Sequence, residues 1–432
     1  MNIPFNNIRY IMTIALLSVF FTLSAQKVPI VISNAMVHVG NASIIDNGMV
    51  IIQEGILQYV GPKKESGYDD NTATMIDASG KHIYPGIIAM NNQLGLKEIE
   101  AVRATRDAYE VGQFNPNIRS IIAYNTDSKA IATLRTNGIL LSQVIPDGGI
   151  ISGQSSVVKL SGWNWEDAAV KMDNNMHMYW PGYYGYDYIK GEYKKSDTYD
   201  NEVIAIKNFF DEAKAYCNST DHAVKNLRFE SMRKIFSAEQ KLFIDANDAK
   251  QIIGVVDFAK QYQIKIVLVG GRQSYRVLDL LKENNIPVLL ECTHELPGLE
   301  GDPVELPYKL PSILLKAGIE CGLSVSNEGG SFWNMRNLPF DAGTAAAYGI
   351  TKEDALKMIT LTNAKLLGIE KNYGTLETGK SATLFISEGD VLDMRTSRIT
   401  NIYINGEKTQ VTNWQTDLSK KYEQKYGIEI TE

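Results

Sequence analysis

The sequence is poor in the residues that build metal centres and disulfide frameworks. Its 432 residues include five histidines and three cysteines. The cysteines, Cys217, Cys292 and Cys321, are odd in number and far apart, so they predict neither a disulfide framework nor a C-x-x-C metal motif. We interpret them as small buried apolar side chains.

Runs of basic residues are also missing. The chain has 43 Lys and Arg against 50 Asp and Glu, a formal net charge of −7. Nucleic acids and anionic membrane surfaces bind clustered positive charge, so the composition argues against both as partners of the mature protein. Hydrophobic residues make up 44% and charged residues 22%, as in globular proteins, and the length suffices for a large α/β barrel with an appended domain.

One long apolar run is present, at the N-terminus. It spans Tyr10 to Ala25, "YIMTIALLSVFFTLSA", and follows Arg9, the only charge in that region. A charged start, an apolar middle and small residues at the end are typical of a secretory signal peptide. We therefore predict a signal peptide over residues 1–25 and export to the periplasm or the extracellular space. The alternative, an uncleaved membrane anchor, would need a slightly longer run.

Two strand-rich blocks lie near the ends of the mature chain. Residues 28–60 are rich in Val and Ile and are broken by turn pairs, and residues 382–411 contain the hairpin turn Asn405-Gly406. We predict that residues 26–82 and 375–411 form one composite β-sandwich domain. A helical tail is expected over residues 412–432.

Between these blocks, apolar strands alternate with amphipathic helices. Residues 248–263 place their apolar side chains on one helical face, and Thr351 is a predicted helix N-cap. This alternation is typical of a parallel sheet that is covered on both faces. The predicted fold class is α/β: a distorted (β/α)8 TIM barrel over residues 83–374, with its site at the C-terminal ends of the strands. The expected strands are 83–90, 138–145, 157–160, 241–246, 264–269, 286–291 and 319–326.

Four motifs carry a resemblance to a known family. "GKHIYPGIIAMNNQLGL" (80–96), "KLFIDANDAKQI" (241–252) and "GLSVSNEGGSFWNMRNLPF" (322–340) resemble its first, fifth and eighth barrel strands, and "GTLETGKSATLFISEGD" (374–390) resembles its return to the β domain. The chain resembles the amidohydrolase superfamily, specifically its exported imidazolonepropionase-like branch. The resemblance implies a distorted barrel with a β-sandwich appendage and metal-assisted hydrolysis of non-peptide C–N bonds.

The resemblance also locates the family's metal-ligand positions, and none of them holds a histidine here. The bridging lysine of the fourth strand has no clear match, and Lys171 is the nearest candidate. The first-strand pair falls on Asn91 and Gln93, the fifth-strand ligand on Asp245, the sixth-strand ligand on Gly270 or Gly271, and the eighth-strand acid on Asn327 or Glu328.

These replacements change the expected chemistry. Zinc prefers imidazole, thiolate and carboxylate ligands, whereas amide oxygens are neutral and weaker. We therefore expect no cofactor and no zinc, and an all-oxygen cluster would suit a hard ion such as Ca²⁺ or Mg²⁺ better. In the alternative interpretation, Asn91 and Gln93 hydrogen-bond to each other and to Asp245 as a satisfied polar network.

Two further regions supply candidate site residues. His294 follows the seventh predicted strand, so it is expected at the barrel mouth as an acid, a base or a substrate donor, or else bonded to a loop carbonyl. The segment "MYWPGYYGYDYIKGEYKKSDTYD" is rich in tyrosine, and Tyr183, Tyr184 and Tyr186 could line a cleft or a subunit interface. The alternative is a loop that folds back over its own barrel.

The functional prediction follows from these residues. The chain is expected to be at most a hydrolase of non-peptide C–N bonds with an altered or absent metal, in which Asp245, Glu328 and His294 carry the chemistry. The ligand-binding candidates are Asn91, Gln93, Asn327 and the three tyrosines. The alternative is a catalytically inactive barrel that binds a small ligand or pairs with an active relative. A homo-oligomer is a further expectation for its partners.

Overall fold

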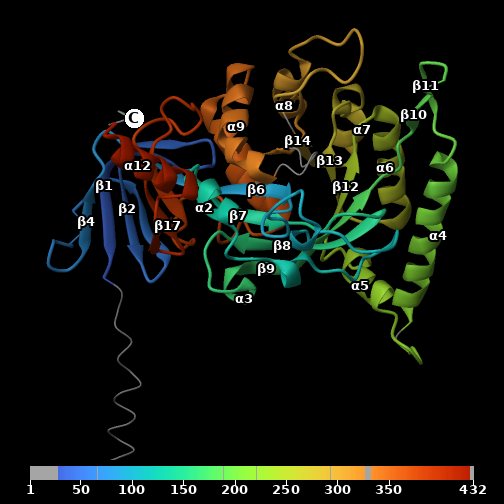
Figure 1. The fold of residues 1–432 in the computed structure, drawn as a ribbon, viewed down its shortest axis with the longest axis horizontal. Coiled ribbons are helices and arrows are strands. Elements are labelled where there is room, and N and C mark those ends of the chain that lie inside the picture. Colours follow the sequence, from blue (N-terminus) through green and yellow to red (C-terminus); the bar gives the residue numbers. More distant parts are fainter. Residues whose placement is uncertain are drawn as a thin grey trace, which may run out of the picture.

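The computed structural model describes residues 28–428 apart from 66, 188, 220, 292 and 326–331. The predicted signal peptide and the candidates Asn327 and Glu328 therefore lie outside the described residues. Two large sheets dominate the rest (Figure 1). One is built from both ends of the chain, drawn in blue and red, and the other from its middle.

The first sheet joins strands that are about 300 residues apart in the sequence. Its order is β18-β17-β16-β5-β1-β2-β3, and β4 pairs with the first half of β1, on the same edge as β5. β5 runs antiparallel to β16, with Tyr84 opposite Phe385, and a bridge between Ile56 and Ser381 brings β3 back beside the segment that precedes β16. The strands are β1 (Ile30–His38), β2 (Ile44–Gln53), β3 (Ile56–Pro62), β4 (Thr74–Asp77), β5 (His82–Pro85), β16 (Leu384–Ser387), β17 (Ile399–Ile404) and β18 (Glu407–Thr409).

The second sheet is a nearly closed eight-stranded barrel, which confirms the predicted fold class. Neighbouring strands are parallel except at β8, which is antiparallel to both of its neighbours. At the closure, the Ser324 hydroxyl donates to the Met90 carbonyl (2.6 Å), and the Asn363 amide donates to carbonyls of both edge strands. In sheet order the strands are β6 (Ile87–Asn92), β7 (Ile139–Val144), β8 (Ile151–Lys159), β9 (Ala169–Tyr179), β12 (Leu242–Ala246), β13 (Ile266–Gly270), β14 (Val288–Glu291) and β15 (Cys321–Ser324).

Two expected strands differ from the observed ones. The strand predicted over 83–90 splits at Gly86, where a Cβ would lie 2.9 Å from the Thr383 side chain, so β5 joins one sheet and β6 the other. The strand expected over 157–160 is the end of the longer β8, and β9 was not predicted at all. Its first half, "AVKMDNN", carries polar and charged residues that do not resemble a buried strand.

Helices cover the outside of the barrel. The expected helix at 248–263 is α6, which a capping box between Asp248 and Gln251 begins, and Thr351 caps α10 as predicted. No helix within the described residues is long and apolar enough to span a membrane. The helices are α2 (Lys129–Arg135), α3 (Trp165–Ala168), α4 (Tyr199–Asn218), α5 (Leu227–Phe236), α6 (Ala249–Tyr262), α7 (Leu278–Glu283), α8 (Leu306–Ala317), α9 (Leu338–Ala347), α10 (Lys352–Lys357), α11 (Asn363–Leu367) and α12 (Trp414–Tyr426).

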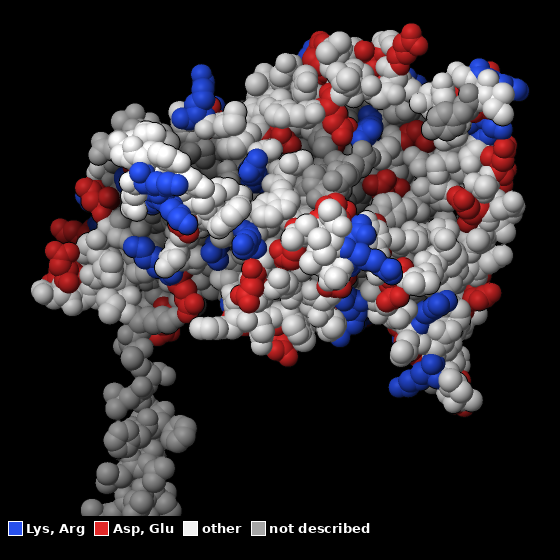
Figure 2. Space-filling view, viewed as in Figure 1, with Lys and Arg blue, Asp and Glu red and all other residues white. Residues whose placement is uncertain are grey.

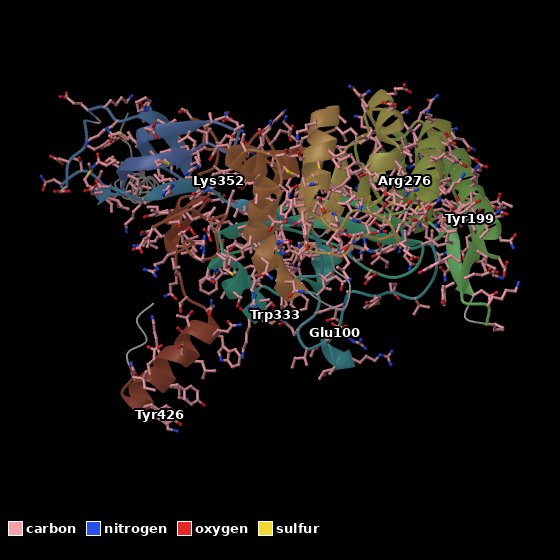
Figure 3. The ribbon with its side chains drawn as sticks, turned by 90° about the horizontal axis from the view of Figure 1, so that it is seen from above. Glu100, Tyr199, Arg276, Trp333, Lys352 and Tyr426 are labelled. Carbon is pink, nitrogen blue, oxygen red and sulfur yellow. The ribbon has the colours of Figure 1, made fainter. Side chains whose placement is uncertain are left out.

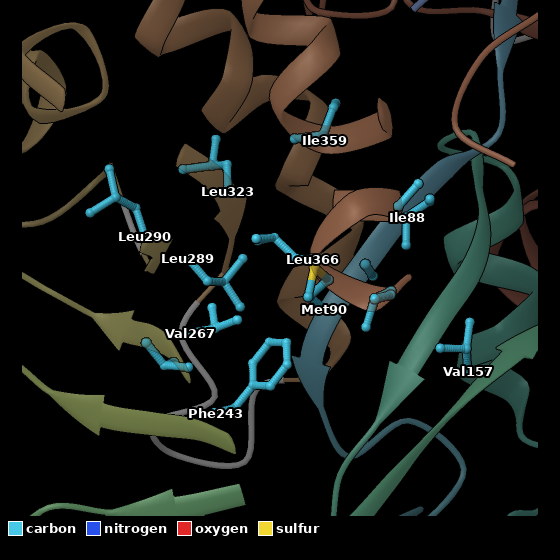
Figure 4. Packing of buried hydrophobic residues seen from close by; sticks show 14 of the residues in the cluster. Ile88, Met90, Val157, Phe243, Val267, Leu289, Leu290, Leu323, Ile359 and Leu366 are labelled. Carbon is cyan, nitrogen blue, oxygen red and sulfur yellow. The ribbon is translucent and has the colours of Figure 1, made fainter. Parts of the chain in front are cut away.

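Side-chain alternation along the strands separates an apolar core from a polar barrel mouth. Phe243, Val267 and Leu289 are buried to 1% exposure or less and converge on the barrel interior (Figure 4). Because side chains alternate with a period of two, the inward residues one step nearer the C-terminal ends of β12 and β14 are Asp245 and Glu291. The barrel interior is therefore apolar, and acidic side chains lie at its mouth.

Candidate functional site: a hydrogen-bonded barrel mouth

The two amides that follow β6 are each held by a carboxylate. The Asn91 amide donates to Glu291 Oε1 (2.5 Å), and the Gln93 amide donates to Asp147 Oδ2 (2.5 Å). Asp147 also accepts a hydrogen bond from the Tyr179 hydroxyl (3.1 Å). Since hydrogen bonds to charged acceptors are about twice as strong as neutral ones, these pairs fix the amide side chains at the mouth.

Asp245 lies at the centre of the mouth but takes no part in these pairs. It stands opposite Tyr179 in the β9–β12 register and accepts a hydrogen bond from the Asn247 amide (3.2 Å). A cavity of about 10 Å³ lies between Asp245, Asn91, Tyr179 and His177, enough for a single water molecule. The expected network of Asn91, Gln93 and Asp245 is thus wrong in its partners, because Glu291 and Asp147 accept from the amides instead.

The sequence interpretation missed His177 as a mouth residue. It lies two residues before Tyr179 on β9, so the two side chains share one face of the strand. Its ring stacks on Phe243 (5.1 Å between centroids), and its Nε2 is 3.2 Å from the Gln143 amide nitrogen. Burial without a charged partner lowers the pKa of His177 to about 3. The period-two pattern could have revealed it, had β9 been recognised as a strand.

This buried histidine predicts acid sensitivity. The folded protein holds His177 neutral down to a pKa of about 3, whereas the unfolded chain binds a proton near its ordinary value of 6.5. Stability is therefore lost as the pH falls below the unfolded value. Between pH 7 and pH 5 we expect a loss of about 2 kcal/mol from this residue. The variant His177→Gln keeps a polar partner for Gln143. Its free energy of unfolding, measured with urea, should fall by about 2 kcal/mol less than that of the wild type between pH 7 and pH 5.

The other four histidines are present in the wild type and in His177→Gln, so their contributions to the pH dependence of stability cancel in this comparison. Equal pH slopes for the wild type and His177→Gln would show that the ring is solvated or charged in the folded state.

A pocket of about 220 Å³ opens beside the mouth, at the ends of β12, β13 and β14. Its apolar wall includes Leu290, Leu306 and Leu310, and the loop after β14 covers it. Arg272 lines it and pairs with Glu295 (3.0 Å). On the face shown in Figure 2, acidic and basic side chains are interspersed without an extended basic patch. The polar residues of the pocket are Asn247, Asp248, Gln251, Arg272, Gln273, Glu291, Glu295 and Asp302.

His294 does not line this pocket. It follows β14 as expected, but its Nδ1 is 3.2 Å from Asp341 Oδ1 and its Nε2 contacts the Thr344 hydroxyl, both on α9. Among the residues that the structure describes, it is bonded neither to a loop carbonyl nor to any of the mouth residues above. Glu291 and Glu295 face the pocket, whereas Thr293 and His294, between them, face α9.

The tyrosine-rich segment forms a hairpin of β10 (Tyr184–Asp187) and β11 (Glu192–Lys195). Tyr183 packs edge-on against Tyr184 and against Tyr199 of α4, and Tyr186 packs against Tyr193 within the hairpin. These ring contacts hold the hairpin to α4 at the rim of the barrel. That these tyrosines line a cleft or a subunit interface stays a prediction. Tyr184 lies close enough to Arg276 to contribute to raising the pKa of that guanidinium.

Two positions taken from the resemblance cannot supply ligands. Lys171 lies near the start of β9, where its ammonium donates to the carbonyls of Leu367 and Gly368, so it is at the opposite end of the strand from the mouth. Gly270 ends β13 with φ +81°, and a Cβ there would collide with the Asn247 amide. A side-chain ligand is therefore excluded at Gly270 by both conformation and space.

Comparisons with known proteins agree with this architecture. A model of the amidohydrolase family matches residues 310–417. An imidazolonepropionase from Rhizobium rhizogenes is 24% identical over 392 residues, 84% of this chain and 92% of the relative. A solved amidohydrolase from Thermotoga maritima is 23% identical with a TM-score of 0.76, over 88% of this chain and 99% of that one. The chain is thus similar to amidohydrolases in sequence and in fold.

Among other proteins of known structure, molinate hydrolase shares the fold at a TM-score of 0.55 and 13% identity, over 89% of this chain and 95% of that one. Against this common fold, the residues at the mouth do not fit a zinc ion. Two ligand positions hold amides that are bonded to carboxylates, and a third holds glycine. Within the described ranges, no three His, Cys, Asp or Glu side chains come together as a metal site.

Proposed function

We propose that this amidohydrolase-superfamily protein binds a small ligand at its barrel mouth without zinc. The observation that carries the proposal is the pairing of Asn91 with Glu291 and of Gln93 with Asp147. In these bonds the carboxylates at the mouth accept from the two amide side chains. The donor set thus supports recognition of a polar ligand by hydrogen bonds and does not favour activation of water by a metal.

The pocket lining supports a particular class of ligand. Carboxylates outnumber cations around it, and the one lining arginine, Arg272, is already paired with Glu295. Carboxylates only accept hydrogen bonds when ionised, so they select ligands with amine or amide N–H groups. Leu290, Leu306 and Leu310 add an apolar wall. We infer an amino-bearing small molecule with an apolar side chain.

A second candidate is residual hydrolysis with Asp245 as the base. The observation that favours it is the water-sized cavity that Asp245 borders with Asn91 and Tyr179. A carboxylate beside one water can remove a proton from it as the water attacks a carbonyl. Such activity would be insensitive to chelators. We also propose, from the N-terminal sequence alone, that the protein acts outside the cytoplasm.

Binding of leucinamide tests the ligand class, because it joins an amine, an amide and a leucine side chain. We expect saturable binding by calorimetry, weakened about tenfold or more in Glu291→Gln, since a charged hydrogen bond contributes about 1.5–3 kcal/mol. Glu320→Gln is the matched control, because Glu320 is half-exposed and does not line the pocket. Absence of binding, or equal weakening in both variants, would contradict the proposal.

A further inference from the structure

A second group of reactive side chains lies outside the barrel mouth. A groove of about 480 Å³ runs between α9 and the loop that follows β16. His294 and Thr344 line it, together with Lys352 at the start of α10. Lys352 lies at the junction between the barrel and the β domain (Figure 3). The groove is therefore assembled from four separate parts of the chain.

Three side chains are connected in series along this groove. Asp341 is 4% exposed, and its Oδ1 lies 3.2 Å from Nδ1 of His294. The other ring nitrogen, Nε2, contacts the Thr344 hydroxyl. A buried acid, an imidazole and a hydroxyl in this order form the arrangement by which a histidine activates a nucleophile while a carboxylate orients it.

The local backbone keeps the hydroxyl accessible. Gly343 precedes Thr344, and a Cβ at this glycine would collide with the Leu392 carbonyl oxygen. The glycine thus allows the loop after β16 to approach α9 and to form the groove wall. The Thr344 hydroxyl also donates to the Phe340 carbonyl (3.1 Å), so its proton has two acceptors within reach, Phe340 O and His294 Nε2.

The lining of the groove indicates which substrates would fit. Phe340, Ile350, Leu392 and Met394 supply an apolar surface for a small acyl group. Lys352 and Arg395 place positive charge on the walls, although each is paired, with Asp390 and Asp393. Positive charge beside the reacting carbonyl favours the anionic tetrahedral intermediate of acyl transfer.

We propose that Thr344, His294 and Asp341 form a second, metal-independent site that cleaves esters of small apolar acids. The Thr344 oxygen attacks the ester carbonyl, and its proton passes to His294 Nε2. The intermediate collapses, and His294 returns the proton to the departing alcohol. Water, deprotonated by His294, then attacks the acyl carbon, the bond to Thr344 breaks, and His294 returns the proton to the Thr344 oxygen, so ester and water become acid and alcohol.

The proposed site has a defined pH dependence. Burial raises the pKa of Asp341 to about 7 and lowers that of His294. Below pH 7 the protonated Asp341 donates to Nδ1 of His294. The ring hydrogen then lies on Nε2, so this nitrogen cannot accept a proton from Thr344. Loss of that proton makes Nε2 an acceptor, so reactivity should rise with pH. The other charged or titratable groups that face His294 or line the groove are Tyr308, Lys352, Asp390, Asp393 and Arg395.

A fluorophosphonate probe, which reacts with activated hydroxyls, tests the site directly. We expect covalent labelling that peptide mass spectrometry locates at Thr344, about tenfold faster at pH 8 than at pH 6. Thr344→Val should abolish labelling, Thr344→Ser should retain it, and Asp341→Asn should slow it at least tenfold. Thermal unfolding of each variant separates loss of the nucleophile from loss of the fold.

Labelling of the wild type and of Thr344→Val decides the proposal. No labelling, labelling at another residue, or labelling that persists in Thr344→Val would overturn it. The outcome is independent of the mouth pocket, because Glu291→Gln should leave the rate of labelling unchanged.

Discussion

Freshly purified protein is expected to hold no stoichiometric zinc. A tight zinc site needs three or four strong ligands, usually His or Cys with a carboxylate. The matching positions here offer the amides of Asn91 and Gln93, the carboxylate of Asp245, a glycine at 270 or 271, and either Asn327 or Glu328. Each amide nitrogen is bonded to a carboxylate, Asn91 to Glu291 and Gln93 to Asp147, and the remaining amide oxygens are neutral, weak ligands. Elemental analysis of unsupplemented protein measures the result.

The same contacts predict that two histidines would not restore the metal. In Asn91→His with Gln93→His, imidazoles would replace the donors to Glu291 and Asp147, but Gly270 would still contribute nothing. The double variant is expected to bind zinc no more than about tenfold better than the wild type, since weak sites lack the closed ligand set. About one zinc per chain in the wild type would return this protein to the metal-dependent hydrolases.

Removal of residues 382–432 is expected to unfold the N-terminal strands as well. β16 pairs with β5, and Leu384, Ile386 and Tyr403 are buried in the same cluster as Ile32 and other side chains of the N-terminal strands. Loss of a large buried side chain costs about 2–5 kcal/mol, so losing three exceeds much of the stability of a typical domain, about 5–15 kcal/mol. Hydrogen exchange over residues 30–60 should lose its protection.

A shorter truncation, of residues 418–432, is the control for this experiment. It removes most of α12, which has no buried residue and projects from the body with Tyr426 near its tip (Figure 3). The contacts of Asn413 and Gln415 with α2 and its C-cap remain. The control should keep the wild-type protection over residues 30–60. Full protection in the longer truncation would show that the two blocks fold independently.

The fold could be predicted where local patterns were regular. Apolar strands such as Leu242–Ala246 and Ile266–Gly270 and the amphipathic α6 follow directly from periodicity. β9 could not, because its outer half is polar, and the break at Gly86 depends on Thr383, nearly 300 residues away. Local sequence contains no information about such a neighbour.

The candidate site divides in the same way. The positions of Asn91, Asp245 and Gly270 at strand ends could be predicted, because parallel strands of a barrel end at one face. Their partners could not. Glu291 and Asp147 come from other strands and loops, and the register between strands decides which side chains meet.

His294 shows the difference most clearly. Its place after the seventh strand was predicted from the sequence, but its direction was not, because one residue of rotation in a loop turns a side chain from the pocket to α9. The sequence by itself determined the residue types at the mouth, and with them the absence of histidine at the matched positions. Only the tertiary structure decided which carboxylate holds which amide and which acid faces His294, because these contacts join segments that only folding brings together.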